Sequence, residues 1–254
     1  MNPFFFGDSK EPLYGVYHPP AGANKDEGVV LCYPFGQEGM RAHRAMRQLA
    51  MQLTKKGFHV LRFDCRGTGD SALDMEDIEA QTWLEDTGVA IDELRAMAGV
   101  SQISVIGLRL GALIAAATAT ARSDIKRLVL WDPILSGADY IRELKQEISQ
   151  EKPIIGNYEE ADGRLNFNGF ALTACFQQGL EKLQLLEMKP NAKQIYQAVS
   201  HKEDAFAALK QSWSAYEGFH YRMTPAPHDW NYVDKVGGIL LPQPIIQAIV
   251  NWME

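Results

Sequence analysis

The chain has 254 residues and a formal net charge of −7, with 46% hydrophobic and 22% charged residues. This balance fits one packed domain and excludes a disordered or collagen-like chain. The negative charge, with no cluster of lysine and arginine standing out against it, excludes nucleic acid as a partner and favours small molecules or proteins.

Targeting signals and cysteines bear on the compartment. Residues 1–15 lack a basic region followed by a long apolar stretch, so a secretion signal is not predicted, and no segment reads as a membrane span. The three cysteines, Cys32, Cys65 and Cys175, have no metal-binding spacing, and their odd number argues against a disulfide framework. We therefore expect a cytoplasmic protein that holds no metal and no cofactor.

Strand-like and helix-like patterns alternate along the first half of the chain. Two short apolar runs within residues 4–19, separated by GDSKEP, predict an antiparallel hairpin at a sheet edge. A continuous apolar run predicts a buried strand at 29–33, and further strands are predicted at 59–63, 103–106 and 128–131. Helical spacing and alanine-rich composition predict helices at 42–57, 82–99 and 112–121. This alternation predicts a mainly parallel sheet with helices on both faces.

The pattern changes at about residue 137 and resumes at about residue 193. Two helix-like pieces, 140–150 and 174–189, are joined by a stretch that we expect to be irregular, 157–170. Beyond them the sequence predicts strands at 194–199 and 218–223 and a closing helix at 242–252. We therefore expect a single α/β domain, 1–254, with a helical lid inserted at about 137–193.

A glycine-bracketed turn follows the strand predicted at 103–106. Gly107, Arg109 and Gly111 give the spacing GxRxG. In a GxSxG nucleophile elbow the middle residue sits at the tip of a sharp strand-to-helix turn, and the glycines let the backbone pass where a Cβ would clash. The sequence therefore predicts an elbow that carries arginine where a hydrolase carries serine.

Two further loops complete the pattern. Residues 63–72, FDCRGTGDSA, resemble the turn after the fourth strand of α/β hydrolases, and residues 32–39, CYPFGQEG, resemble their oxyanion loop. With the elbow, these loops make the chain resemble the α/β-hydrolase superfamily over almost its full length, near serine aminopeptidase-like and exosortase-associated hydrolase-like sequences, some of which share the GLRLG elbow. The resemblance implies an α/β-hydrolase fold and an oxyanion hole formed by the backbone N–H groups of Phe35 and Leu110.

The resemblance also implies an order of nucleophile, acid and histidine, which falls here on Arg109, Asp204 and His228. The acid and the histidine match the family pattern, and the arginine departs from it. A guanidinium stays protonated and has no lone pair to attack an acyl carbon, which argues against catalysis through an acyl-serine.

Each candidate has an alternative role. Arg109 either binds an anionic group of a substrate or pairs with an internal carboxylate such as Asp204. His228 acts either as a general base with Asp204 or as a loop histidine satisfied by backbone carbonyls or by Asp229. Glu203 and Asp132 are alternatives for the acid, and His201 and His220 are alternatives for the histidine. Cys65 and Cys32 are candidates for a replacement nucleophile.

Three functional hypotheses follow. The first is a hydrolase-like protein that binds an acyl- or carboxylate-bearing small molecule through Phe35, Leu110 and Arg109, with general-base hydrolase or lyase chemistry by His228 and Asp204. The second is a noncatalytic pseudo-hydrolase that serves as a binding or assembly partner in a biosynthetic or export pathway. The third is an esterase or peptidase with an unrecognised nucleophile. Assembly as a homodimer is left open.

Overall fold

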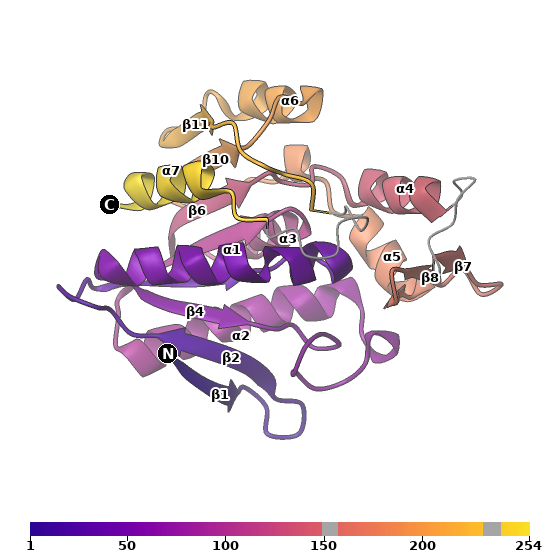
Figure 1. Ribbon diagram of the computed structural model, residues 1–254, viewed down its shortest axis with the longest axis horizontal. Coiled ribbons are helices and arrows are strands. Elements are labelled where there is room, and N and C mark those ends of the chain that lie inside the picture. Colours follow the sequence, from indigo (N-terminus) through magenta and orange to yellow (C-terminus); the bar gives the residue numbers. More distant parts are fainter. Residues whose placement is uncertain (149–156, 231–239) are drawn as a thin grey trace.

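The computed structural model describes residues 1–148, 157–230 and 240–254. Its centre is an eight-stranded sheet in the order β1-β2-β4-β3-β5-β6-β10-β11 (Figure 1). The strands are β1 Asn2–Phe6, β2 Leu13–His18, β3 Glu27–Cys32, β4 His59–Phe63, β5 Gln102–Leu108, β6 Ile125–Trp131, β10 Gln194–Val199 and β11 Phe219–Met223. β1 and β2 pair antiparallel, as does β2 with β4, and the remaining pairs are parallel. The N-terminal hairpin and the mainly parallel sheet are thus confirmed.

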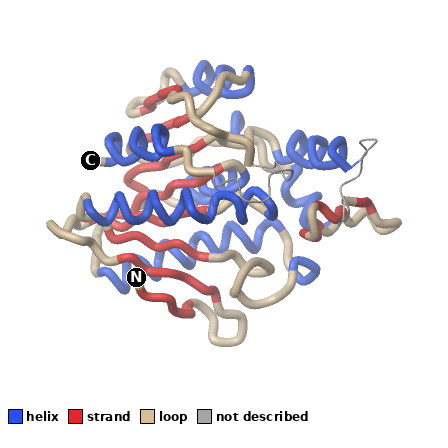
Figure 2. The backbone as a smooth tube through the Cα atoms, in the orientation of Figure 1, coloured by secondary structure: helices blue, strands red, loops and turns tan. Residues whose placement is uncertain are grey.

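Helices cover both faces of this sheet (Figure 2). They are α1 Gly36–Lys55, α2 Ala80–Ala98, α3 Leu110–Ala121, α6 Asp204–Trp213 and α7 Gln243–Met253. Val29 and Leu31 of β3 belong to the core shared with α1 and α7, whereas Val30 and Cys32 belong to the core shared with α2 and α3. Because strand side chains alternate between faces, a strand buried on both sides must be apolar throughout. The continuous apolar runs in the sequence have this cause.

Two helices differ from the sequence prediction. α1 begins at Gly36, ahead of the predicted start at residue 42, because a positive φ of 57° at Gly36 turns the loop directly into the helix. α6 was not predicted, because it begins within the polar run 201–204, of which Asp204 was considered only as a candidate acid. The earlier start of α1 places Glu38 inside the helix, which matters for the site below.

The segment between β6 and β10 contains α4 Gly137–Ile148, α5 Ala174–Glu181 and a small antiparallel sheet. The strands of this small sheet are β7 Tyr158–Glu159, β8 Leu165–Phe167 and β9 Phe170–Leu172. The prediction that 157–170 is irregular is therefore wrong. Asn168 and Gly169, both with positive φ, form a two-residue hairpin turn between the paired Phe167 and Phe170, and Asn-Gly is a recognised signal for that turn. A lid role for the segment stays a prediction.

Short 3₁₀ turns at Met75–Asp77 and Leu185–Glu187 complete the regular structure of the described residues. In the described ranges, 1–148, 157–230 and 240–254, no helix combines the length and the apolar character needed to cross a membrane.

Candidate functional site at the elbow

The elbow is a strained turn between β5 and α3. Arg109 at its tip has φ 54° and ψ −118°, a conformation that non-glycine residues seldom adopt. A Cβ on Gly107 would lie 2.2 Å from Gly111 O, and a Cβ on Gly111 would lie 2.4 Å from Cys32 O. Both flanking positions therefore exclude any side chain, which confirms the predicted turn geometry.

Hydrogen bonds hold the backbone of the tip. Arg109 N donates to Trp131 O across 3.0 Å, and Arg109 O accepts from Ala112 N at 3.0 Å and from Ile134 N at 3.3 Å. The strained conformation is thus fixed by β6 and the loop that follows it. Because the backbone of Arg109 is held in this way, the direction in which its side chain leaves the turn is fixed by the fold.

The Arg109 side chain forms an ion pair with Glu38 of α1. Arg109 Nε donates to Glu38 Oε1 across 3.0 Å, and the Glu38 side chain is 1% exposed. Burial is the largest single influence and lowers the pKa of Arg109, but the charge and hydrogen bond of Glu38, together with Tyr140 and Glu143, leave that pKa above its usual value. Of the two sequence alternatives for Arg109, pairing with an internal carboxylate is realised, with Glu38 in place of Asp204.

Further carboxylates from α4 act on the same guanidinium. Burial is the main cause of the raised pKa of both Glu143 and Glu147, and the charge of Glu38 adds to it in each case. Glu38 Oε2 is buried without a hydrogen-bond partner in the described part of the protein. Glu143 and Glu147 therefore act on Arg109 from a distance, while Glu38 is the carboxylate in direct contact with it among the described residues.

A cavity of about 380 Å³ opens beside this ion pair. It is lined by Glu38, Arg109, Glu147, His201, His228, Asp229 and Trp230. The fold thus brings four residues named from the sequence, Arg109, His201, His228 and Asp229, to one cavity from distant parts of the chain. Sequence reasoning missed Glu38 and Glu147. Glu38 was missed because the predicted helix began at residue 42, whereas α1 begins at Gly36 and includes Glu38.

His228 stacks on His201 in this cavity. The ring centroids are 3.9 Å apart and the planes differ by 9°. His228 Nδ1 lies 3.1 Å from Ala226 O, a carbonyl that can only accept, so Nδ1 carries the proton. In neutral His228 the lone pair then lies on Nε2, the tautomer that a general base requires.

Asp204 does not lie against His228. It is exposed at the first position of α6, and no hydrogen bond or ion pair joins it to His228 among the described residues. The acid that His228 would need in a triad is replaced by the carbonyl of Ala226. The dyad of His228 and Asp204 expected from the sequence is therefore not assembled in this structure.

The rival residues form a chain of their own through Ser200, which the sequence did not single out. Asp132, fully buried at the end of β6, accepts 2.7 Å hydrogen bonds from Ser200 N and from Ser200 Oγ. Ser200 Oγ lies 3.1 Å from His201 Nδ1, and His201 Nε2 lies 3.3 Å from Glu203 Oε2. Burial raises the pKa of Asp132 although both bonds to Ser200 oppose the shift. His201 is thus the histidine linked to carboxylates.

The two oxyanion-hole candidates lie at helix starts. Phe35 immediately precedes α1, and Leu110 is the first residue of α3, where an N–H has no acceptor within its own helix. The close approach of Gly111 to the carbonyls of Cys32 and Tyr33 brings the two loops together. The Phe35 ring is buried between Trp83 and Phe170. Anion binding by these N–H groups stays a prediction.

The cysteines are poor nucleophile candidates. Burial raises the pKa of Cys32 to about 12 and that of Cys65 well above its usual value, so both thiols stay protonated. Neither residue lines the cavity beside Arg109. Over the described part of the chain, no three His, Cys, Asp or Glu side chains converge as metal ligands.

Solved structures with the same fold span the whole chain. Est1E from Butyrivibrio proteoclasticus, solved with ferulic acid, shares 17% identity at a TM-score of 0.71 and covers 98% of this chain and 97% of its own. An esterase of Pyrococcus furiosus shares 17% identity at a TM-score of 0.66, covering 99% and 89%. A thioesterase domain from the curacin biosynthetic pathway shares 15% identity at a TM-score of 0.63, covering 100% and 98%. At these identities the likeness establishes the fold.

Comparison with curated protein sequences finds no match. A family model described as serine aminopeptidase, S33, matches residues 37–207, a region that runs from the start of α1 through the elbow into α6. On that match and on the architecture described above, the chain belongs to the serine aminopeptidase S33 family of α/β hydrolases.

Proposed function

We propose that this α/β-hydrolase-like protein binds a small acyl or carboxylate compound noncovalently at the elbow and forms no acyl-enzyme. One observation carries the proposal: the position of the nucleophile holds Arg109, a permanently protonated side chain fixed by the buried Glu38. A guanidinium cannot attack an acyl carbon, but it binds carboxylate and carbonyl oxygens well.

The remaining donors of Arg109 suit such a ligand. Glu38 accepts from Nε, and no other carboxylate lies within ion-pair distance of Arg109 in the described ranges. The terminal nitrogens of a guanidinium match the two oxygens of a carboxylate. Glu147 in the cavity wall disfavours ligands with several negative charges. The proposed ligand is therefore a monocarboxylate or an uncharged acyl compound, and ferulate, bound by Est1E, is a reasonable first probe.

Ligand binding is measurable through tryptophan fluorescence. Trp230 lines the cavity and packs edge-on against Trp131, with the ring centroids 5.7 Å apart. We expect saturable quenching by ferulate or octanoate in the wild type and at least about tenfold weaker binding in Arg109→Gln. Arg142→Gln, on the exposed surface of α4, is the matched control. Equal affinity in Arg109→Gln and wild type would refute the proposal.

A second candidate function is hydrolysis with His228 as general base. It rests on the tautomer set by Ala226 O, which leaves the Nε2 lone pair available in the cavity. Hydrolysis of p-nitrophenyl acyl esters by wild type, His228→Ala and Arg109→Ser separates the two functions. Wild-type turnover that His228→Ala abolishes supports the enzyme. An inactive wild type with an active Arg109→Ser supports binding, because only the nucleophile would then be missing.

The broader context also belongs to the proposal. A protein that binds an acyl ligand without turning it over would suit a binding or assembly partner in a biosynthetic or export pathway. The three free cysteines support a reducing cytoplasm as its compartment. Homodimer formation is tested by sedimentation equilibrium of the purified chain with and without ferulate.

A further inference from the structure

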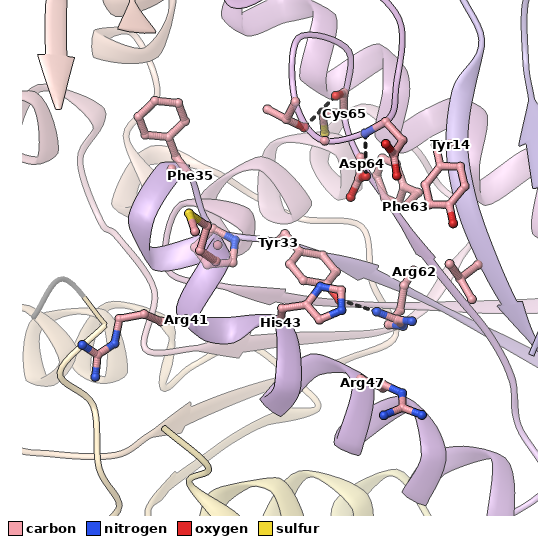
Figure 3. A pocket seen from close by; sticks show the side chains of 18 of the residues that line it. Tyr14, Tyr33, Phe35, Arg41, His43, Arg47, Arg62, Phe63, Asp64 and Cys65 are labelled. Carbon is pink, nitrogen blue, oxygen red and sulfur yellow. Dashed lines mark hydrogen bonds between the residues drawn. The ribbon is translucent and has the colours of Figure 1, made fainter. Parts of the chain in front are cut away.

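A second and larger cavity lies on the other side of α1, and its floor is a buried arginine. Arg62 on β4 is 5% exposed and has no carboxylate within ion-pair distance in the described ranges. Its Nε donates to His18 Nε2 across 2.9 Å. Its Nη1 donates to Tyr33 Oη, also across 2.9 Å, and both Arg62 and Tyr33 line the cavity (Figure 3). Burial and the charge of Arg62 lower the pKa of His18 to about 4, so this partner is neutral. Arg62 is a buried cation with no carboxylate in direct contact among the described residues, and Asp64 of the same cavity acts on it only at longer range. A bound anion would compensate this buried charge more closely.

Three arginines of α1 line the same cavity. Arg41, Arg44 and Arg47 recur every three residues on one side of the helix, and none pairs with a carboxylate of the described chain. The Arg41 Nε is buried without a hydrogen-bond partner. Most other arginines do pair with carboxylates, namely Arg66, Arg95, Arg109, Arg122, Arg127, Arg142 and Arg164, and Arg222 is the exception. Unpaired arginines thus gather at one cavity of a protein whose net charge is −7.

This basic cluster corrects the sequence analysis, which found no concentration of lysine and arginine. The spacing of Arg41, Arg44 and Arg47 is visible in the sequence once a helix is assumed, but Arg62 joins them only because β4 lies beside α1 in the fold. Nucleic acid was excluded as a partner partly because no basic cluster was seen in the sequence. An oligonucleotide is therefore included in the test below.

The cavity has the size and walls of a small-molecule site. Its volume is about 1010 Å³, and apolar side chains from three parts of the chain line it, including Val16, Phe63 and Trp83. Asp64 and Asp70, in the loop after β4, supply the opposing charges. Burial raises the pKa of Asp64, while the charges of His43 and Arg62 act in the opposite direction. The excess of positive charge lies at the α1 end.

This cavity is distinct from the one beside Arg109. The two share no lining residue, although Phe35 of the oxyanion loop lines the larger one. α1 divides them, with Glu38 turned to one cavity and Arg41, Arg44 and Arg47 to the other. A ligand bound here would not need the chemistry of the elbow.

We infer that this cavity binds a phosphate or diphosphate ester, with the phosphoryl group held by Arg62, Arg44 and Arg47 and the organic part against the apolar wall. Several guanidinium groups suit a group that carries two or more negative charges and several acceptor oxygens better than a single carboxylate. The buried Arg62 would contact the phosphoryl group from a fixed position. The exposed Arg44 and Arg47 would attract the anion and close over it.

Calorimetric titration of the full chain with pyrophosphate tests the inference. We expect saturable one-to-one binding, weakened at least about tenfold in Arg44→Gln/Arg47→Gln, a change that removes two charges from a solvent-facing helix side without disturbing the core. Arg222→Gln, an exposed arginine that is unpaired but lies outside the cavity, is expected to bind as wild type does. Arg62→Gln is expected to weaken binding further, and the exposed double variant decides the question if Arg62→Gln does not fold.

Titration with hexose 1-phosphate and with dodecyl phosphate identifies the organic part of the ligand. Tighter binding of either ester than of inorganic phosphate supports the inference. Preference for the hexose ester indicates a polar organic part, and preference for the dodecyl ester indicates an apolar one. The inference is wrong if the wild type binds none of these probes, if the double variant binds as wild type does, or if Arg222→Gln loses as much affinity. It is also wrong if a single-stranded oligonucleotide displaces pyrophosphate and depends on Arg44 and Arg47. None of these outcomes depends on Arg109 or on acyl ligands.

Discussion

Glu38 Oε1 accepts a hydrogen bond from Arg109 Nε across 3.0 Å and so ties the first turn of α1 to the tip of the elbow. In a serine hydrolase of this fold the same tip presents a small nucleophile to the substrate. Here it presents a cation whose partner is almost completely buried, and both members of the pair line the cavity that also holds His201 and His228.

Breaking this ion pair is expected to destabilise the fold. Glu38→Gln removes the one carboxylate in direct contact with Arg109 among the described residues and should lower the free energy of unfolding by about 3 kcal/mol. Glu38→Gln/Arg109→Met, which removes both charges, should recover most of that loss. Urea unfolding measures both, with the exposed Glu181→Gln as the control that stays within about 0.5 kcal/mol of wild type. Equal stability of Glu38→Gln and wild type would show that the pair contributes nothing.

The glycine after the elbow is expected to be irreplaceable. Gly111→Ala would place a Cβ 2.4 Å from Cys32 O, a backbone atom that cannot rotate away. We expect a loss of about 4 kcal/mol or more, or failure to fold. Gly22→Ala is the matched control, because nothing lies within 4 Å of a Cβ there, and its melting temperature should stay close to that of wild type. A folded, fully stable Gly111→Ala would mean that the turn is looser than described.

Stability is expected to fall between pH 6.5 and pH 4 through His18. Burial and the charge of Arg62 lower its pKa from 6.5 to about 4, so the unfolded chain binds this proton more readily in that interval. The contribution is complete above pH 6.5 and is lost as the pH falls. His18→Gln keeps a hydrogen-bond acceptor for Arg62. It should reduce the loss of unfolding free energy between pH 6.5 and pH 4 by about 1–3 kcal/mol.

The control for this pH dependence is His220→Gln, which changes an exposed histidine of β11. Its stability should follow the wild-type curve from pH 7 to pH 4, measured by urea unfolding at each pH. If His18→Gln also follows the wild-type curve, the titration of His18 is not the cause.

Asp132 and Asp204, the two rival acids, are expected to differ in their effect on stability. Asp132→Asn keeps a residue that tolerates the positive φ of 42° but loses one of two acceptors for Ser200, at a cost of about 1–2 kcal/mol. Asp204→Asn changes an exposed side chain and should cost less than about 0.5 kcal/mol. Chemical unfolding compares them, and a larger loss in Asp204→Asn would contradict the assignment of the buried role to Asp132.

Much of the architecture could be predicted because the strands and helices that are buried carry apolar residues in a regular pattern along the sequence. The strands at 59–63 and 194–199 were predicted with the bounds that the structure shows, although each includes polar residues, such as Arg62 and Gln197. The first turn of α1 was missed because Gly36 and Gly39 frame it without apolar periodicity. The small sheet at 158–172 was missed because its strands are too short for a pattern to develop.

The sequence by itself determined the fold, the elbow and its arginine, because alternating apolar runs and paired glycines act over a few residues. Tertiary structure decided which side chains meet there. Glu38 reaches Arg109, His201 stacks on His228, and Arg62 joins the arginines of α1, in each case across many residues of chain. Such contacts depend on the register of helices and strands packed against one another, and a shift of one residue in a helix turns a side chain by about 100°. Local patterns do not fix that register, and only the packed core does.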